Sequence, residues 1–296
     1  MKTKKNRPVA LLTTDDLHGH VTDDELLIEP LAALGRTAEF VSWRAGVDWR
    51  DYAGVVIRSP WDYTEAAEQF MAALEAIAAV GTPLANSLSL VRWNLDKRYL
   101  RELEGREVPV VPTLWLDDLS QNAINQAFDS FGCQELVLKP VLGASARDTF
   151  RMTPGSVEQA TLGCFSDRPC MLQPFLKEIV SEGEHSLFYF AGELSHVVCK
   201  RPAEGDFRVQ EEHGGQLDAV AAEAPMTALA ERVLAELNEQ PLYARVDLVE
   251  TQGGIRLMEL ELVEPSLYLR LSDGAPARLA SAIDRWLSAD KGSRHR

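Results

Sequence analysis

The chain has 296 residues, of which 46% are hydrophobic and 25% charged, and its formal net charge is −15. This length is enough for more than one core. The acidic balance argues against nucleic acid as the main partner, because phosphate-backbone binding relies on Lys and Arg. A nucleotide needs only a few local cations. No apolar run is long enough for a membrane span or a signal peptide, so we expect a cytoplasmic protein without a membrane partner. The four cysteines form no CxxC pair, which predicts reduced core thiols.

Strands and helices alternate over the first ninety residues. The predicted elements are strands at 9–14, 37–43 and 54–58 and helices at 24–35 and 64–80. We expect Asp24 and Thr64 to cap the two helices. Strands that alternate with helices indicate βαβ units, so residues 1–92 are expected to form a Rossmann-like α/β lobe with a parallel sheet. The lobe lacks GxGxxG, which argues against a dinucleotide site there.

From residue 93 onward, strands come in pairs. The expected strands are at 108–116, 135–141, 148–152, 170–175, 184–190 and 194–200, with a hairpin near 243–261. The expected helices are near 93–100, 119–131, 157–165, 226–237 and 277–287. Paired strands with short turns indicate antiparallel sheets, so this part is α+β. We expect two subdomains, at 93–175 and 176–290, and a frayed tail at 291–296.

Three carboxylates lie in the predicted hairpin. Glu259 and Glu261 share one strand face, and a short turn allows Asp247 to lie across from them. Carboxylates crowded on one face repel unless a cation lies between them, and Mg²⁺ is commonly shared between protein carboxylates and phosphates. The hairpin therefore predicts a Mg²⁺–nucleotide site. The alternative is an acidic hairpin edge that faces solvent.

Two further segments suggest the rest of a nucleotide site. Lys139 ends an apolar strand and is followed by Pro140 and a turn of small residues around Gly143, where backbone N–H groups can approach a phosphate. A hairpin turn with an edge lysine is the alternative. The run from Gln173 to Glu184 is an apolar strand, a link and an acidic patch, which suits a flat base and ribose hydroxyls. The alternative there is an ordinary linker.

Residues 58–63 follow a predicted strand at the end where α/β sheets bind ligands. Arg58 is placed to pair with a substrate carboxylate. Trp61 and Tyr63, which flank Asp62, are placed to pack against the substrate. The alternative is that the two rings belong to the core and Arg58 to a structural ion pair.

The order of these parts resembles the ATP-grasp superfamily, of the glutathione synthetase and ribosomal-protein-S6 modification type. The resemblance rests on Asp96-Lys97, Lys139-Pro140, the small-residue loop, Gln173-Pro174-Phe175-Leu176, Arg245-x-Asp247 and Glu259-x-Glu261. The segments at 58–63 and 92–100 are most similar to the branch that includes the cycloserine-forming O-ureido-serine cyclo-ligase. Many family members have Glu-x-Asn where this chain has Glu259-x-Glu261. We interpret the second carboxylate as a variant, because it also coordinates Mg²⁺.

The resemblance implies an ATP-grasp fold of two subdomains that clamp ATP, and it implies a role for each matching residue. It implies that Lys97, Lys139 and Arg245 contact the phosphates of ATP, and that Gly143, Ala144 and Ser145 close over them. It implies that Gln173, Phe175 and Leu176 line the adenine cleft and that Glu184 or Glu178 holds the ribose. It also implies that Asp247, Glu259 and Glu261 bind two Mg²⁺ ions (with Mn²⁺ as an alternative), and that Arg201 and Arg208 meet the substrate carboxylate or the γ-phosphate.

The resemblance also implies the chemistry. ATP would phosphorylate a carboxylate of an amino acid or small peptide-like molecule, and a nitrogen nucleophile would attack the resulting acylphosphate. Ring closure, intermolecular ligation and a non-catalytic ATP-binding module remain as alternatives at this point. A homodimer is expected only at the level of the family.

Overall fold

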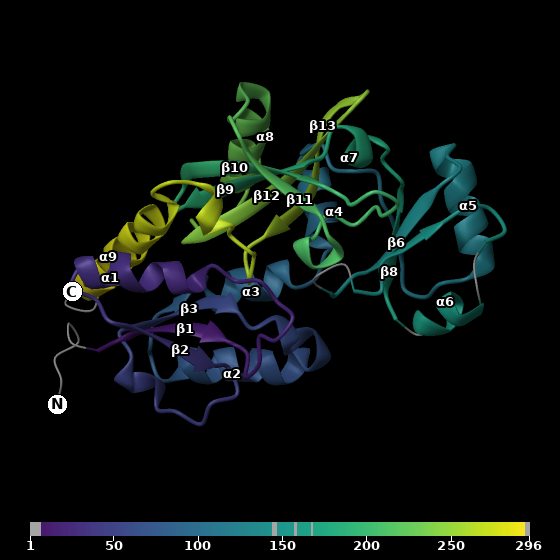
Figure 1. Cartoon of the computed structure of the whole chain (residues 1–296). Coiled ribbons are helices and arrows are strands. Elements are labelled where there is room, and N and C mark those ends of the chain that lie inside the picture. The colour runs from purple at the N-terminus through teal and green to yellow at the C-terminus, as the bar shows by residue number, and fades with distance from the viewer. Residues whose placement is uncertain (1–6, 144–146, 157–158, 167, 294–296) are drawn as a thin grey trace.

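A computed structural model describes residues 7–143, 147–156, 159–166 and 168–293. These residues form an N-terminal lobe, a small subdomain and a large sheet. In the view of Figure 1 the large sheet lies above the N-terminal lobe, and the small subdomain lies to the right of the large sheet. Within the described ranges, no helix has the length and apolar character that a membrane crossing requires.

The N-terminal lobe contains a parallel sheet. Its elements are β1 (Val9–Thr13), α1 (Ile28–Ala33), β2 (Ala38–Ser42), β3 (Gly54–Ser59), α2 (Ala67–Ala79), β4 (Leu84–Ala85) and α3 (Leu88–Asn94). The strands lie in the order β2-β1-β3-β4 and all pair in parallel, which confirms the expected α/β lobe. The central strands β1 and β3 are buried at every residue, as parallel strands covered on both faces are.

Both expected helix caps in this lobe are wrong. Asp24 opens a short 3₁₀ helix (Asp24–Leu27), and its carboxylate accepts a hydrogen bond from Arg58 instead of capping the backbone. Thr64 lies inside a second 3₁₀ helix (Trp61–Glu65), and α2 begins only at Ala67. A nearby guanidinium offers Asp24 a stronger partner than a backbone N–H does.

The small subdomain contains an antiparallel sheet in the order β5-β8-β6-β7. Its elements are β5 (Leu114–Leu116), α5 (Gln121–Phe131), β6 (Leu136–Pro140), β7 (Phe150–Met152), α6 (Gln159–Cys164) and β8 (Cys170–Pro174). The expected strand at 108–116 is reduced to three residues, because Pro109 and Pro112 cannot donate to a ladder. The helix expected near 93–100 is two helices, α3 and α4 (Tyr99–Gly105), and Lys97 lies in the break between them.

The large sheet is antiparallel, in the order β11-β10-β9-β12-β13. Its elements are α7 (Glu178–Ser181), β9 (Glu184–Phe190), β10 (Glu193–Arg201), β11 (Gln216–Val220), α8 (Ala224–Ala235), β12 (Tyr243–Thr251), β13 (Gly254–Glu261) and α9 (Ala275–Ser293). The sequence did not predict β11, and α9 extends beyond its expected end at residue 287. The prediction of an α/β lobe followed by α+β architecture is confirmed.

Side chains from the lobe and from α4 cover the outer edge of β13. Asn94 donates to the carbonyl of Leu260 and accepts from the N–H of Leu262, both at 2.7 Å. The Tyr99 hydroxyl likewise bonds to the N–H and the carbonyl of Leu260, both at 2.8 Å. Asn86 donates to the carbonyl of Leu262 at 2.7 Å. These side chains replace a neighbouring strand, so the edge that carries Glu259 and Glu261 is paired.

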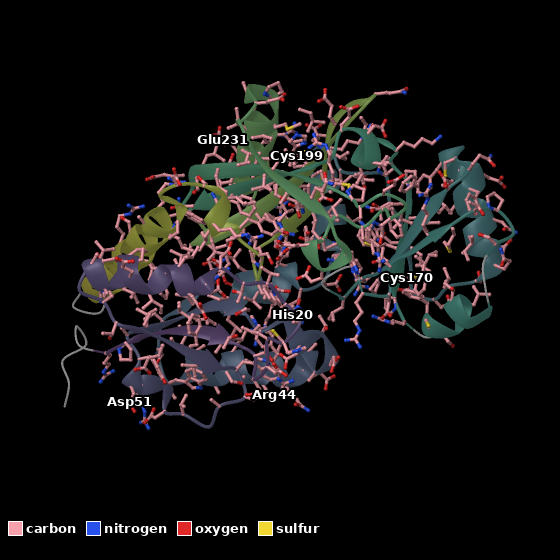
Figure 2. The ribbon with its side chains drawn as sticks, in the orientation of Figure 1. His20, Arg44, Asp51, Cys170, Cys199 and Glu231 are labelled. Carbon is pink, nitrogen blue, oxygen red and sulfur yellow. The ribbon has the colours of Figure 1, made fainter. Side chains whose placement is uncertain are left out.

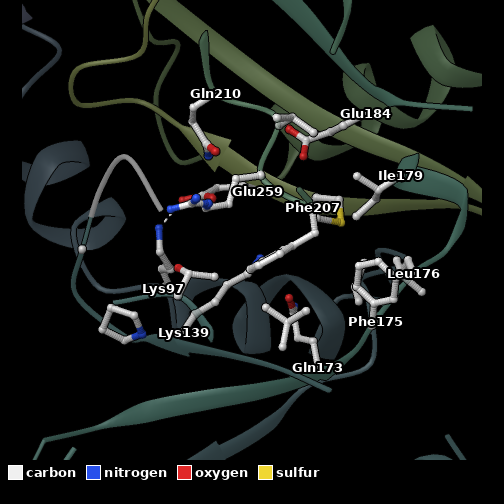
Figure 3. Close-up of a pocket in the computed structure, with 18 of the residues that line it drawn as sticks. Lys97, Lys139, Gln173, Phe175, Leu176, Ile179, Glu184, Phe207, Gln210 and Glu259 are labelled. Carbon is white, nitrogen blue, oxygen red and sulfur yellow. Dashed lines mark hydrogen bonds and ion pairs between the residues drawn. The ribbon is translucent and has the colours of Figure 1, made fainter. Parts of the chain in front are cut away.

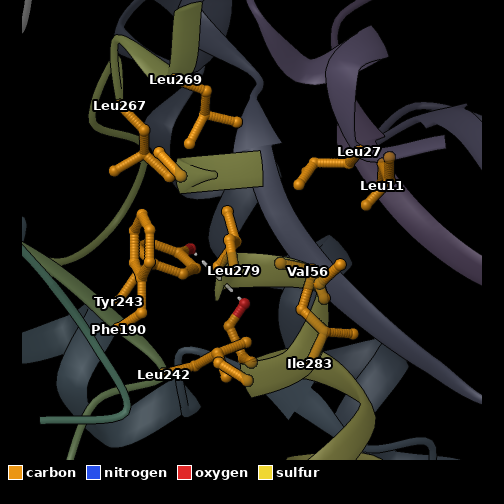
Figure 4. Packing of buried hydrophobic residues seen from close by; sticks show 14 of the residues in the cluster. Leu11, Leu27, Val56, Phe190, Leu242, Tyr243, Leu267, Leu269, Leu279 and Ile283 are labelled. Carbon is orange, nitrogen blue, oxygen red and sulfur yellow. Dashed lines mark hydrogen bonds between the residues drawn. The ribbon is translucent and has the colours of Figure 1, made fainter. Parts of the chain in front are cut away.

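One hydrophobic cluster joins the lobe to the large sheet. Val56 of β3, Tyr243 of β12 and Ile283 of α9 belong to this cluster, all of them fully buried (Figure 4). The Tyr243 hydroxyl lies 2.7 Å from the carbonyl of Ile57 and 2.8 Å from that of Val263. The end of β3 is therefore fixed beside the loop that follows β13.

All four cysteines are free, as expected, but only two of them are buried. Cys170 lies in the small subdomain and Cys199 in the large sheet (Figure 2). Burial raises the pKa of the Cys170 thiol to about 11. Cys164 is exposed, so the prediction that all are core thiols is wrong for that residue.

Candidate active site

Four charged side chains share one face of the β12–β13 hairpin. Across the ladder, Arg245 lies opposite Glu261 and Asp247 opposite Glu259. Directly opposite residues, and residues two apart on one strand, point to the same side of a sheet. The alternation in the sequence predicts this arrangement. The register shifts directly after Asp247, so the regular pairing ends beside these four residues.

The carboxylates on this face contact cations. The guanidinium of Arg245 donates to both oxygens of Asp247 at 3.0–3.1 Å and also to Glu261. The ammonium of Lys200 lies 2.5 Å from Glu184 and 3.4 Å from Asp247. Burial acts to raise the pKa of Asp247, but Arg245 and Lys200 outweigh burial and lower it to about 2. Asp247 is therefore ionised and is held by two cations.

Two lysines reach Glu259 from other parts of the fold. Lys97 comes from the break between α3 and α4 and forms an ion pair with Glu259. Burial acts to lower the pKa of Lys97, and Glu259 outweighs it, so the net shift is upward. Lys139 comes from β6, and burial lowers its pKa. Both ammonium groups are thus directed at the acidic face from separate elements (Figure 3).

The acidic face fits a cation that is shared with a phosphate. Burial, together with Glu259 and Asp247, raises the pKa of Glu261 to about 8 despite the neighbouring Arg245. Burial is the largest cause of this shift, and a bound cation would favour the ionised form of Glu261. Among the described residues, no three His, Cys, Asp or Glu side chains form a ready protein cage for a metal. Mg²⁺ seldom uses such a cage, because it binds one or two carboxylates together with substrate phosphates and water. The donor set is suited to that mode.

A first cavity lies between the small subdomain and the large sheet (Figure 3). The residues expected at the nucleotide that line it are Lys97, Lys139, Gly143, Gln173, Phe175, Leu176, Glu184, Arg208, Glu259 and Glu261. Ala144 and Ser145 lie outside the described residues. Glu178 is not part of the lining, whereas its neighbour Ile179 is, so Glu184 is the better placed of the two ribose candidates.

The far end of this cavity is apolar. Phe175, Leu176, Ile179 and Phe207 line it, and the rings of Phe175 and Phe207 lie edge to face with centroids 6.4 Å apart. The guanidinium of Arg151 lies 3.8 Å from the centre of the Phe175 ring. Apolar walls at one end, with ammonium groups and carboxylates at the other, suit a molecule with a flat base and a phosphate chain.

A second cavity adjoins the first. The residues that line both cavities are Lys97, Gly143, Gln210, Glu259 and Glu261. The residues found only in the second cavity include Trp61, Tyr63, Lys200, Glu212, Arg245, Glu264, Ser266 and Tyr268. The second cavity thus carries charges of both signs and lies between the N-terminal lobe and the large sheet. The lysine and the two carboxylates that line both cavities stand where the two meet.

Several predicted site residues lie elsewhere. Arg58 is 2% exposed, donates to Asp24 at 2.9 Å and to the carbonyl of Pro265 at 3.0 Å, and lines neither cavity. It therefore has the structural ion pair that the alternative interpretation describes. Asp62 accepts from the Trp43 indole at 2.7 Å and also lines neither cavity.

The three arginines expected near the substrate are separated. Arg201 forms an ion pair with Asp218 at 3.1 Å on the exposed side of β10 and lines neither cavity. Arg208 lines the first cavity, where Asp206 holds its guanidinium at 2.8 Å. Arg245 lines the second cavity. Only Arg208 and Arg245 are therefore near the two cavities.

Reasoning from the sequence missed Lys200, Gln210 and Glu264. Lys200 is 3% exposed and directly follows the apolar run Val197-Val198-Cys199 in β10, much as Lys139 follows the apolar run of β6. The side-chain oxygen of Gln210 is buried at the boundary of the two cavities, with no hydrogen-bond partner in the described part of the protein. Glu264 lies beyond the end of β13, so the alternation that places Glu259 and Glu261 on one face does not extend to it. The loop after β13 places it in the wall of the second cavity.

Comparison with known families agrees with this architecture. Residues 117–272 match the prokaryotic glutathione synthetase ATP-grasp domain, and residues 9–86 match the N-terminal domain of D-cycloserine synthetase DcsG. The cycloserine biosynthesis protein DcsG of Streptomyces lavendulae is 34% identical over 278 residues, which cover 87% of this chain and 91% of that protein.

Solved structures give the same result. The crystal structure of D-cycloserine synthetase DcsG matches with a TM-score of 0.82 at 31% identity, over 94% of this chain and 99% of that one. The ATP-grasp ligase PsnB, in a complex with its minimal precursor, Mg and ADP, shares the fold with a TM-score of 0.65 at 18% identity, over 96% of this chain and 99% of that one. The chain therefore belongs to the ATP-grasp ligases of the prokaryotic glutathione synthetase type, and it is an ADP-forming carbon–nitrogen ligase.

Proposed function

We propose that the protein activates the carboxylate of an amino-acid-like substrate as an acylphosphate and closes a ring by joining it to a nitrogen of the same molecule. The observation that carries the proposal is the meeting of the two cavities at Lys97, Glu259 and Glu261. A nucleotide in the first cavity and a carboxylic acid in the second would have their reacting groups at this boundary.

The reaction has two steps. The substrate carboxylate attacks the γ-phosphorus of ATP, so that an oxygen–phosphorus bond forms and the bond to ADP breaks. The nitrogen then attacks the carbonyl carbon, the carbon–oxygen bond breaks, phosphate leaves, and the nitrogen loses a proton. Phosphoryl transfer depends mainly on positioning and charge neutralisation, so no nucleophilic side chain is needed.

The charged residues of the two cavities and of the hairpin face have positioning roles. The ammonium groups of Lys97 and Lys139 neutralise the phosphate oxygens, and Arg245 neutralises the carboxylate and the departing phosphate. Asp247, Glu259 and Glu261 would hold two Mg²⁺ ions (Mn²⁺ being an alternative). When bound, these ions neutralise charge on the phosphate chain. The apolar end of the first cavity would hold the adenine, and Glu184 the ribose.

Two observations support ring closure: the named activities of the relatives and the charges of the second cavity. The relative with 34% identity is a cycloserine biosynthesis protein, and the 31% identical structure is a D-cycloserine synthetase. The mixed charges of the second cavity suit a molecule that carries both a carboxylate and an amine. Intermolecular ligation of two amino-acid-like molecules is the second candidate, because charges of both signs in the second cavity also suit the carboxylate of one molecule and the amine of another.

The test measures Mg²⁺-dependent ADP release with a panel of amino acids and dipeptides, followed by mass spectrometry of the product. A product lighter than one substrate molecule by one water supports ring closure. A product equal to two molecules less one water contradicts ring closure and supports intermolecular ligation. If no member of the panel stimulates ADP release, the proposed substrate class is wrong.

A further inference from the structure

Glu264 lies in the wall of the second cavity, in the loop after β13. It is 9% exposed and lines that cavity but not the first one. The side chain of Tyr63 lines the same cavity and acts to lower the pKa of its carboxyl group, against the burial that raises it. The indole N–H of Trp61 donates to its backbone carbonyl at 2.9 Å. Trp61 of the N-terminal lobe therefore fixes the backbone of Glu264, and Tyr63 of the same lobe shares the cavity wall with it.

The charge of Glu264 lacks a partner. In the described ranges no ion pair includes this carboxylate, and Lys97, whose charge reaches it, is itself paired with Glu259. Other carboxylates of the second cavity do face basic side chains: Glu261 contacts Arg245, and Glu212 lies 3.9 Å from Nδ1 of His20. A buried carboxylate is costly unless a cation or several donors compensate its charge.

We propose that Glu264 is the binding residue for an ammonium group of the substrate, and that Tyr63 orients it for that purpose. The proposal rests on the proposed function and assigns a specific contact within the same cavity. The Tyr63 hydroxyl is one donor available to the carboxylate in this wall, and a carboxylate can accept several hydrogen bonds. The carboxylate of Glu264 can therefore accept further hydrogen bonds from a charged N–H donor in the cavity. An ammonium group supplies both the missing charge and the missing donors.

The position of Glu264 indicates which amine it binds. The reacting groups meet at the residues that line both cavities, and Glu264 is not one of these. A carboxylate also stabilises the protonated form of an amine, which is not nucleophilic. We infer that the amine at Glu264 is not the one that forms the new bond and that it remains free in the product. Glu264 would thus select amino acids over the corresponding acids that lack this amine.

The test compares binding of matched probes by calorimetry in the presence of ADP and Mg²⁺, without turnover. The probes are alanine, serine and O-ureido-serine, each in both enantiomers and each paired with the analogue in which hydrogen replaces the α-amino group. Wild-type protein is expected to prefer at least one amine-bearing probe to its analogue by about tenfold to a hundredfold. Glu264→Gln, which keeps the shape but removes the charge, is expected to reduce that preference to about twofold or less.

Three controls make the result specific. Glu212→Gln alters a carboxylate of the same cavity that has a basic side chain beside it, and it is expected to keep the preference for the amine. Glu264→Asp keeps the charge and is expected to retain part of the preference even if Glu264→Gln folds poorly. Binding of ADP reports whether the first cavity is intact in each variant.

The outcomes separate this proposal from the proposed function. A full amine preference in Glu264→Gln overturns the assignment, as does a wild-type protein that binds no amine-bearing probe better than its analogue. ADP release by the wild type is measured separately with the same probes. If release is absent while the amine preference still depends on Glu264, the proposed reaction fails and the binding assignment stands.

Discussion

Lys97 and Glu259 form an ion pair although 162 positions separate them in the chain. The pair lies on the wall that the two cavities share, and Lys97 stands in the break between α3 and α4. It links the segment after the N-terminal lobe to the last strand of the large sheet. A change on either side of the pair is therefore expected to affect both cavities.

Replacement of Glu259 by Gln is expected to lower Mg²⁺-dependent ADP release about a hundredfold or more, because the amide loses the charge that holds a cation beside the phosphates. Asp247→Asn is expected to act in the same way. Circular dichroism should show both variants folded. Glu250→Gln, at an exposed position of the same β12 strand, is the matched control. Full activity in either site variant would contradict the assignment of these carboxylates.

Replacement of Lys97 by Met is expected to weaken ATP binding by about tenfold or more, because a charge-assisted contact to phosphate is lost and Glu259 keeps an uncompensated charge. The affinity is measured by calorimetry with a non-hydrolysable ATP analogue. Arg98→Met is the control, since Arg98 is adjacent but pairs with Asp96 at the surface. Equal weakening in both variants would mean that general charge, and not the position of Lys97, controls binding.

Asn94→Leu is expected to destabilise the protein by about 2–4 kcal/mol, because the N–H of Leu262 and the carbonyl of Leu260 lose their buried partner. Urea denaturation measures the change in the free energy of unfolding. Asn125→Leu, at an exposed helical position, should change it by less than about 0.5 kcal/mol. Turnover of Asn94→Leu is also expected to fall, since these hydrogen bonds position the strand that carries Glu259. An unfolding free energy equal to wild type would show that the edge of β13 needs no such cover.

The stability of the protein is expected to depend on pH through His196. Its Nε2 lies 3.0 Å from the carbonyl of Leu267, and burial lowers its pKa from 6.5 to about 4. Between pH 6.5 and about 4, this histidine is therefore protonated in the unfolded chain but not in the folded protein. The stability contributed by the neutral ring is present above pH 6.5 and is lost as the pH falls through this window. The loss from this group reaches at most about 3 kcal/mol.

Urea denaturation at pH 6.5 and pH 4.5 checks this prediction. His196→Gln is expected to show a smaller loss of unfolding free energy between the two pH values than wild type. His18→Gln, at an exposed position, should show the wild-type loss. An identical loss in wild type and His196→Gln would show that other groups account for the pH dependence.

The acidic hairpin could be predicted because it depends on local geometry. Side chains alternate along a strand whatever surrounds it, so Glu259 and Glu261 had to share a face, and a two-residue turn brought Asp247 opposite. The position of Lys139 at the end of an apolar strand followed from the same reasoning. The alternation of strands and helices likewise indicated the parallel sheet of the N-terminal lobe.

The partners of individual charges could not be predicted. Arg58 at the end of β3 had the features of a substrate-binding residue, yet Asp24 and the carbonyl of Pro265 hold it. The helix near residue 93 was expected to continue through Lys97, and its interruption places that lysine at the site. Such pairings join segments that are far apart in the chain, and no local pattern encodes them.

By itself, the sequence determined the type and order of the elements and which side chains share a strand face, because backbone dihedrals and alternation act over a few residues. The tertiary structure alone decided which charges meet. Asn94 covers the edge of β13, Lys200 reaches Asp247, and Glu264 keeps a buried carboxylate that forms no ion pair with the described residues. These contacts depend on how the lobe and the large sheet pack. That packing is driven by burial of one hydrophobic cluster, whose residues come from segments between Val9 and Leu287.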